Sequence, residues 1–310
     1  MKSHPLRIAL ACSLSLPLGV AVAPPALAQD AAAVDEDIAT TPTDLAELLG
    51  PDGLEGAAGE FYLRLHAPDF GGDVEGVMHW RIVVEDGRLV LTMNETQGHG
   101  VTVRRQVFAA DGAFIESSKH HTGSESTRFE TAVREGDTVQ MTRGRTTADW
   151  ESEPREDVVD YEPLVDLVPD AWMPIVLAYH IREGHEQFTF RMSEIYSRQS
   201  RYVEVVYAEH IGTEVIDVLG EEVEAHVLMV TMHSERDGET LERPEAVQEM
   251  QMYVLADGSI VRMRMEMEGM TFSAEAISAE EAEELMSAGR VEGAGEDIDD
   301  AGDAVRDVAE

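Results

Sequence analysis

Methionines at alternate positions are the first residues in this chain that could do chemistry. Met263, Met265 and Met267 share one face of a predicted strand, and Met250 and Met252 lie on a neighbouring predicted strand. Spaced thioethers are soft ligands that suit Cu(I). Flexible methionines also make adaptable surfaces for apolar ligands, and a sheet face packed on a core has the same alternation. The pattern therefore leaves three interpretations open: core, ligand surface and copper site.

The histidines do not form a metal motif. His120 and His121 are adjacent on a predicted strand, so they point to opposite faces, and His226 and His233 are an odd number of residues apart. The sequence has no nucleophile elbow, no HExxH pair and no phosphate-binding glycine loop. Carboxylate pairs can be drawn almost anywhere among 62 acidic residues, so none is informative. We therefore predict no cofactor and no enzymatic activity.

Aromatic side chains recur on the predicted strands and helix. Most would pack in a core, but a curved sheet that is only half covered would leave some of them at its concave mouth, where they could line an apolar pocket. The predicted ligand-contacting residues are Trp80, Tyr62, Trp172, Tyr179, Met263 and Met265.

One apolar segment must position these residues. Residues 170–180 are predicted to form a short buried helix, because Trp172, Ile175, Val176 and Tyr179 follow the i, i+3, i+4, i+7 spacing of one helical face. The segment lies between two long tracts of alternating sequence. We expect the sheet segments to close over it.

The two tracts, residues 60–149 and 185–277, predict antiparallel meanders. Apolar residues alternate with polar ones, and Asp-Gly pairs mark the turns. Short terminal helices are predicted near residue 44 and over 279–288, where capping boxes precede apolar residues. Since no βαβ alternation is present, we predict a mainly β (α+β) fold: a curved antiparallel sheet, or half-barrel, wrapped around a short central helix.

The region of about 164–277 resembles a family of exported bacterial proteins known as a domain of unknown function. The resemblance lies in WMPIVL (172–177), Gly184, FTF (188–190), EVID (214–217), AHVLMV (225–230) and DGSIVRM (257–263). The Lys-Pro-Gly that usually follows the family's helix is replaced here by Arg182, Glu183 and Gly184. The resemblance implies a curved antiparallel sheet around a helix, similar to periplasmic lipoprotein carriers, and it implies no catalytic residue.

The ends of the chain predict export. Residues 1–28 have two basic residues, an apolar run and a small-residue cleavage site after Ala28, as in a secretory signal peptide. A disordered leader is expected over 29–43, a single domain over 44–289 and a disordered acidic tail over 290–310. The only cysteine lies in the signal peptide, so no disulfide is predicted. We expect a periplasmic or secreted protein that is not an integral membrane protein.

The charge limits the partners. A net charge of −39 would repel nucleic acid and anionic surfaces. Our first hypothesis is a non-enzymatic binding module for an apolar ligand, such as a lipid or acyl chain, on the concave sheet face. The alternatives are a structural or interaction protein of the envelope without a pocket, and copper handling by Met263, Met265 and Met267.

Overall fold

The structure is a computed structural model. It describes residues 38–67, 74–97, 100–123, 126–147, 150–162, 166–197, 202–236, 239–240, 247–267 and 270–288. The predicted signal peptide, most of the predicted leader and the predicted acidic tail lie outside these residues.

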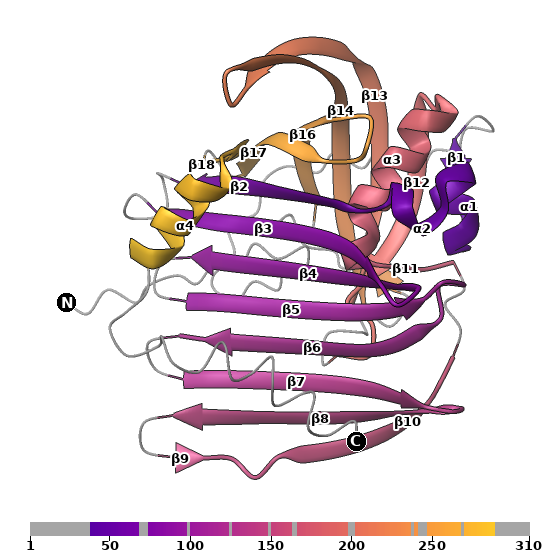
Figure 1. The fold of residues 1–310 in the computed structure, drawn as a ribbon, viewed down its shortest axis with the longest axis vertical. Coiled ribbons are helices and arrows are strands. Elements are labelled where there is room, and N and C mark those ends of the chain that lie inside the picture. The colour runs from indigo at the N-terminus through magenta and orange to yellow at the C-terminus, as the bar shows by residue number, and fades with distance from the viewer. Residues whose placement is uncertain are drawn as a thin grey trace.

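The first meander is a run of antiparallel strands, each paired with the next along the chain (Figure 1). The strands are β2 (Gly59–Ala67), β3 (Val74–Glu85), β4 (Arg88–Gln97), β5 (Gly100–Ala109), β6 (Phe114–Thr122), β7 (Ser126–Glu135) and β8 (Thr138–Thr147). Two short strands, β9 (Trp150–Glu151) and β10 (Arg155–Asp160), both pair with β8 and form one edge of the sheet.

The second meander follows the same pattern. It contains β12 (Gln187–Ser193), β13 (Tyr202–Val218), β14 (Glu221–Arg236), β15 (Glu239–Thr240), β16 (Val247–Val254), β17 (Ile260–Met267) and β18 (Met270–Ala276). Two short parallel strands, β1 (Ala39–Thr40) and β11 (Val168–Pro169), pair with β12 at the other edge.

Strand β18 pairs with β2, and this pairing joins both meanders into one sheet. Its register sets Ala274 opposite Leu65 and Ala276 opposite Leu63. The sheet is curved, and among the described strands its two edges do not pair with each other. The predicted fold class is therefore confirmed as a curved, unclosed antiparallel sheet with a short central helix.

The helices are short. They are α1 (Leu45–Leu49), η1 (Gly50–Asp52), α2 (Gly53–Gly56), η2 (Asp170–Trp172), α3 (Met173–Glu183) and α4 (Ala279–Ala288). Helix α3 has Pro174 in its first turn, where a missing N–H costs nothing, and it ends at Gly184 in the left-handed conformation with φ of 71°. No described helix is long and apolar enough to span a membrane.

The core lies between the sheet and α3. The predicted helical face is buried at Trp172, Ile175 and Val176, and Tyr179 is partly buried. Other faces of α3 are buried too, since Met173 and Leu177 are also enclosed. The helix is covered nearly all round because the sheet curves around it. We call the sheet face toward α3 the inner face.

The predicted leader differs from the structure where the structure describes it. Ala39 and Thr40 form β1, which pairs in parallel with Phe188 and Thr189 of β12. The Thr41 amide donates a further hydrogen bond to the Thr189 carbonyl oxygen. Composition alone favoured disorder there, but an open sheet edge supplies the backbone partners that this polar segment lacks.

Candidate functional site

The structure gathers four of the predicted ligand residues in the core. Trp80 and Trp172 are each 1% exposed, Met263 is 7% exposed and Met265 is 3% exposed. Both indole Nε1 atoms lack a hydrogen-bond partner among the described residues. These side chains are packed against their neighbours, so a ligand could reach them only if the core opened.

The methionines also lie on the core side of their strands. Met263 stands opposite Met252, and Met265 stands opposite Met250, across β16 and β17. Met267 continues β17 beyond them, but its side chain lies outside the described set. The thioethers of Met252, Met263 and Met265 are enclosed by other core side chains.

Tyr62 and Tyr179 are placed apart from this group. Tyr62 lies on the outer face, where its ring stacks on His79 with centroids 4.3 Å apart and its hydroxyl donates to Glu60 at 2.7 Å. Burial and the Glu60 carboxylate raise the pKa of Tyr62 to about 12. Tyr179 lies half-buried on α3, with the Arg182 guanidinium 5.5 Å from its ring centroid.

A pair of histidines closes the end of α3. His180 is fully buried and stacks on Phe188 with centroids 3.9 Å apart, while its Nε2 lies 2.6 Å from the Thr41 hydroxyl and its Nδ1 lies 2.9 Å from His185 Nδ1. Burial and the neighbouring His185 lower the pKa of His180 to about 3, so the ring is neutral at pH 7. Among the described residues, no group of three or more His, Cys, Asp or Glu side chains is placed to hold a metal ion.

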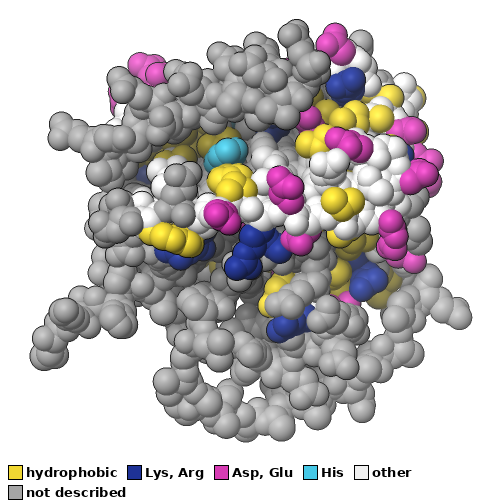
Figure 2. Space-filling view, turned by 90° about the horizontal axis from the view of Figure 1, so that it is seen from below, with side chains coloured by type: hydrophobic (Ala, Val, Ile, Leu, Met, Phe, Trp, Pro, Cys, Tyr) yellow, Lys and Arg dark blue, Asp and Glu magenta, His cyan; other side chains and the backbone are white. Residues whose placement is uncertain are grey.

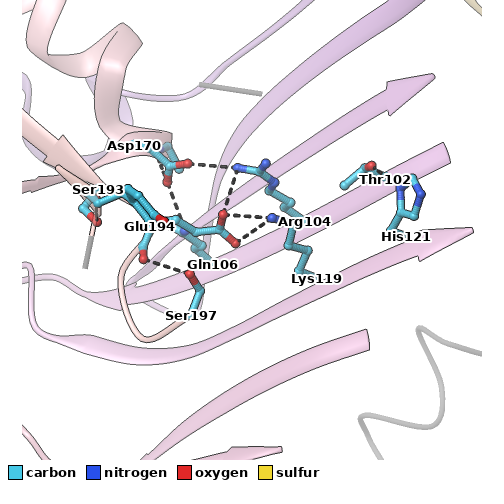
Figure 3. A network of polar contacts seen from close by, with 11 residues as sticks. Thr102, Arg104, Gln106, Lys119, His121, Asp170, Ser193, Glu194 and Ser197 are labelled. Carbon is cyan, nitrogen blue, oxygen red and sulfur yellow. Dashed lines mark hydrogen bonds and ion pairs between the residues drawn. The ribbon is translucent and has the colours of Figure 1, made fainter. Parts of the chain in front are cut away.

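The strongest candidate site is a network of buried charges on the inner face (Figure 3). Arg104 of β5 pairs with Asp170 at 2.9 Å and lies 3.8 Å from Glu194. Lys119 of β6 donates to both oxygens of Glu194, at 3.0 and 2.9 Å. Opposite charges thus alternate along the network, and we call these four residues the charge network.

Two further polar side chains border the network. Gln106 Nε2 donates to Asp170 Oδ1 at 3.3 Å, while Gln106 Oε1 is buried without a hydrogen-bond partner in the described part of the chain. Burial raises the pKa of Glu95 to about 7, although Arg104 and Lys119 partly oppose the rise. Burial also raises the pKa of Asp170 to about 6, against the attraction of Arg104.

A hollow opens beside the network. It lies between the inner face of the first meander and the turn after β12, and it measures about 280 Å³ with the solvent at its mouth included. Its walls include Arg104, Lys119, Glu194, Ser117, Glu130 and Tyr196. The enclosed part has room for little more than a water-sized group, so it suits a small polar group better than an acyl chain.

The local sequence explains how these groups reach the interior. Alternation along β5 puts Arg104 and Gln106 on the same face as Phe108, which is fully buried against Trp172. Asp170 opens the turn η2 at the start of the central helix. Sequence reasoning missed this network, although two polar residues in line with Phe108 were a signal for it.

The charge network could bind a polar group and hold it in place. Its four charged side chains already form ion pairs with one another. Arg104, Asp170, Lys119 and Glu194 form ion pairs within the network, so none is held ready as an isolated acid or base. The raised pKa of Asp170 belongs to a group that is only 2% exposed. The exposed part of the site is the hollow and the inner face beyond it.

Comparisons with known proteins give structural neighbours only. No protein-family model matches this chain, and no curated protein is a significant match. A beta-barrel-like protein of a domain of unknown function from Brucella abortus is 11% identical, with a TM-score of 0.45 over 71% of this chain and 95% of that one. A Bacteroides fragilis protein, described as exported with a YmcC-like fold, is 10% identical, with a TM-score of 0.29 over 70% of this chain and 92% of that one.

Proposed function

We propose that this chain is an exported, non-enzymatic binding module whose ligand lies on the inner face of the sheet, over the hollow. The observation that carries the proposal is that the helices which the structure describes cover only part of this face. Phe108 and Ala132 are fully buried on it, whereas Arg128, farther along β7, and Arg145, opposite it on β8, are exposed. A curved sheet whose inner face is only partly covered by the described helices offers a concave surface for a ligand.

The geometry favours a polar contact for that ligand. The walls of the hollow carry charged and hydroxyl groups, and its enclosed space is small. An apolar ligand in contact with Trp80, Trp172, Met263 and Met265 would need the packed core to open. The proposal therefore places the ligand at the polar end of the inner face, and an acyl chain is an outcome that the test can distinguish.

We also propose that this chain does not catalyse a reaction. Two carboxyl groups in or beside the charge network with raised pKa values, Glu95 and Asp170, are 5% and 2% exposed and lie next to cations. A general acid or base must reach the reacting atom within hydrogen-bond distance. Buried and mutually paired side chains suit a structural anchor for a binding surface better than they suit proton transfer.

The test begins with the full chain isolated from the exported fraction of its native cells. Mass spectrometry of the intact complex should reveal a bound small molecule. Titration of that molecule into stripped protein should then give saturable binding that is weakened at least about tenfold by Ser117→Leu, which fills the hollow. Ser273→Leu is the matched control, because Ser273 lies on β18 away from the hollow.

Two results would contradict the proposal. One is native protein that carries no small molecule and binds none from an extract of the same compartment. The other is a bound acyl chain whose affinity is unchanged by Ser117→Leu but is lost when Met265 is replaced by a charged residue. The second result would move the ligand into the core.

A second candidate, an interaction protein of the envelope, is favoured by the β13–β14 hairpin. Beyond the segments that pair with β12 and β16, this hairpin extends as two strands and forms the top of the molecule in Figure 1. Ile211, Val215 and Leu219 are 51%, 67% and 59% exposed on it. A photo-crosslinking residue at 215 should capture a specific protein in cells if this candidate is correct, and the same residue at exposed Val133 should not.

A further inference from the structure

Three pairs of basic residues stand directly opposite each other across strands of the inner face. Arg104 is opposite Lys119, Arg128 is opposite Arg145, and Arg143 is opposite Arg155. Residues in such register point to the same side of a sheet. The chain has only 23 basic residues against 62 acidic ones, so this concentration of positive charge on one face is unexpected.

Directly opposite like charges destabilise a sheet unless something offsets them. Asp170 and Glu194 offset the innermost pair, Arg104 and Lys119, within the charge network. Asp157 pairs with Arg143 of the outermost pair, whereas Arg145 and Arg155 form no ion pair within the described part of the chain. We call Arg128, Arg143, Arg145 and Arg155 the arginine face.

On the described parts of β5 to β10, two acidic side chains share the inner face with these four arginines. Asp157 pairs with Arg143 at 2.6 Å, and Glu130 stands in register between Lys119 and Arg143. Arg128 and Glu130 also make further contacts. Arg145 is exposed and forms no ion pair with any residue that the structure describes. Among the described residues of β7, β8 and β10, the four arginines of the arginine face thus share the inner face with two acidic side chains.

An exposed tryptophan borders the same surface. Trp150 of β9 stands opposite Thr147 of β8, and Thr147 stands opposite Ser126, so Trp150 shares the face of Arg145. Its side chain is 59% exposed, whereas Trp80 and Trp172 are buried. Seen from below, Figure 2 shows a group of basic side chains near the middle of the view, with acidic side chains beside them and toward the right. Trp150 is therefore the indole that a ligand at this face would contact.

We infer that the arginine face binds a multiply charged anion of the phosphate class, as the charged part of the ligand of this module. The inference rests on the proposed function, because it extends the same binding surface outward from the hollow. Guanidinium groups donate paired hydrogen bonds that match phosphate oxygens. Several arginines on adjacent strands fit an anion with more than one negative charge better than a single carboxylate.

The overall negative charge of the chain affects how an anion could bind at this face. A chain with a net charge of −39 repels anions at long range, so nonspecific binding of a polyanion is disfavoured. Binding would depend on the short-range field of the arginines, and it should weaken as salt screens that field. The phosphate groups could belong to a soluble molecule or to a lipid headgroup, and both present the same chemistry to this face.

The experiment uses the full chain and pyrophosphate as the probe. Pyrophosphate should quench or shift Trp150 fluorescence in a saturable way, with a Kd confirmed by calorimetry. The double variant Arg128→Gln/Arg145→Gln should raise that Kd at least about tenfold. The matched control Arg88→Gln/Arg264→Gln removes the same charge from exposed positions on β4 and β17 and should change it less than about twofold. Acetate at equal ionic strength should leave the fluorescence unchanged.

A second arm separates the two sources of phosphate. Vesicles of phosphatidylglycerol should compete with pyrophosphate if a lipid headgroup can enter the site, and vesicles of phosphatidylcholine should not. Competition only by soluble phosphates would assign the site to a soluble ligand. Either result supports an anion site.

Three results would overturn the inference: no saturable pyrophosphate signal, equal losses in the arginine and control variants, or full replacement of pyrophosphate by acetate. The proposed function would survive them if the co-purified molecule is neutral and still responds to Ser117→Leu. The proposed function itself would be contradicted if no molecule binds at the hollow.

Discussion

Arg104 and Asp170 form an ion pair in the interior, with Nη1 of the arginine 2.9 Å from Oδ2 of the aspartate and both side chains at most 6% exposed. Arg104 belongs to β5 in the first meander, and Asp170 starts the turn that leads into α3. The pair therefore connects the first meander to the central helix. Burying two charges is costly, so it is tolerated only while each keeps its partner.

Removing one partner of this pair should cost much more than removing both. Arg104→Met leaves the Asp170 carboxylate without its nearest cation, and we expect a loss of about 3–5 kcal/mol in the free energy of unfolding. The double variant Arg104→Met/Asp170→Leu leaves no unpaired charge at these positions and should recover a large part of that loss. Urea unfolding of both variants measures the difference. Equal losses would mean that the pair itself contributes little.

Glu95 should make the protein less stable at alkaline pH. Its folded pKa of about 7 lies above the usual value of 4.5, so its contribution to stability is present at low pH and is lost as pH rises through about 7. Replacing Glu95 with Gln removes this titration. The variant should gain about 2–3 kcal/mol relative to wild type between pH 5 and pH 8. A constant difference in unfolding free energy across that range would show that Glu95 is not desolvated.

His180 should have the opposite effect on the pH dependence of stability. Its folded pKa of about 3 lies below the usual 6.5, so the contribution of the neutral ring is complete above pH 6.5 and falls as the unfolded chain takes up a proton. Relative to His180→Gln, wild type should lose about 2 kcal/mol of stability between pH 7.5 and pH 5. Comparison with the variant is needed because Glu95 and Asp170 titrate in the opposite sense. Parallel pH profiles for the two proteins would contradict the burial of a neutral His180.

Local patterns made much of the fold predictable. Strict alternation at Leu63 and Leu65 predicted a strand with one buried face, and both residues are at most 2% exposed. The spacing of Trp172, Ile175 and Val176 predicted the buried face of α3 for the same kind of reason. These signals are visible in sequence because each depends on residues that lie within a few positions of one another.

Long-range relationships were not predictable in this way. Strand β2 pairs with β18, near the other end of the domain, because each would otherwise leave an unpaired edge within the sheet. The charge network joins Arg104 to Asp170 and Glu194, which lie far along the chain. No residue near Arg104 in the sequence indicates which acidic residues it pairs with. A chain with 62 acidic residues offers too many candidates for pairing.

The alternation of side chains along each strand also determines which of the predicted ligand-contacting residues can lie on one face of the sheet. Tyr62 stands opposite His79, and Phe61 stands opposite Trp80, so Tyr62 and Trp80 lie on different faces of the sheet. The alternation of residues 61–66 contained this distinction within one strand. That alternation did not reveal the cross-strand register, which determines which residues of neighbouring strands stand opposite each other.

The contact between the central helix and the second meander can be tested at Gly258. This glycine has φ of +87°, and a Cβ added to it would lie 1.9 Å from the Pro174 carbonyl oxygen of α3. Gly258→Ala should therefore push the β16–β17 turn away from the helix and cost more than about 3 kcal/mol of stability. Gly136→Ala is the matched control, since Gly136 has φ of +64° and no atom within 4 Å of its added Cβ. That control should lose only about 1–2 kcal/mol, from backbone strain alone. Equal losses in urea unfolding would mean that the turn does not pack on α3, and the sheet could not then enclose the helix as described.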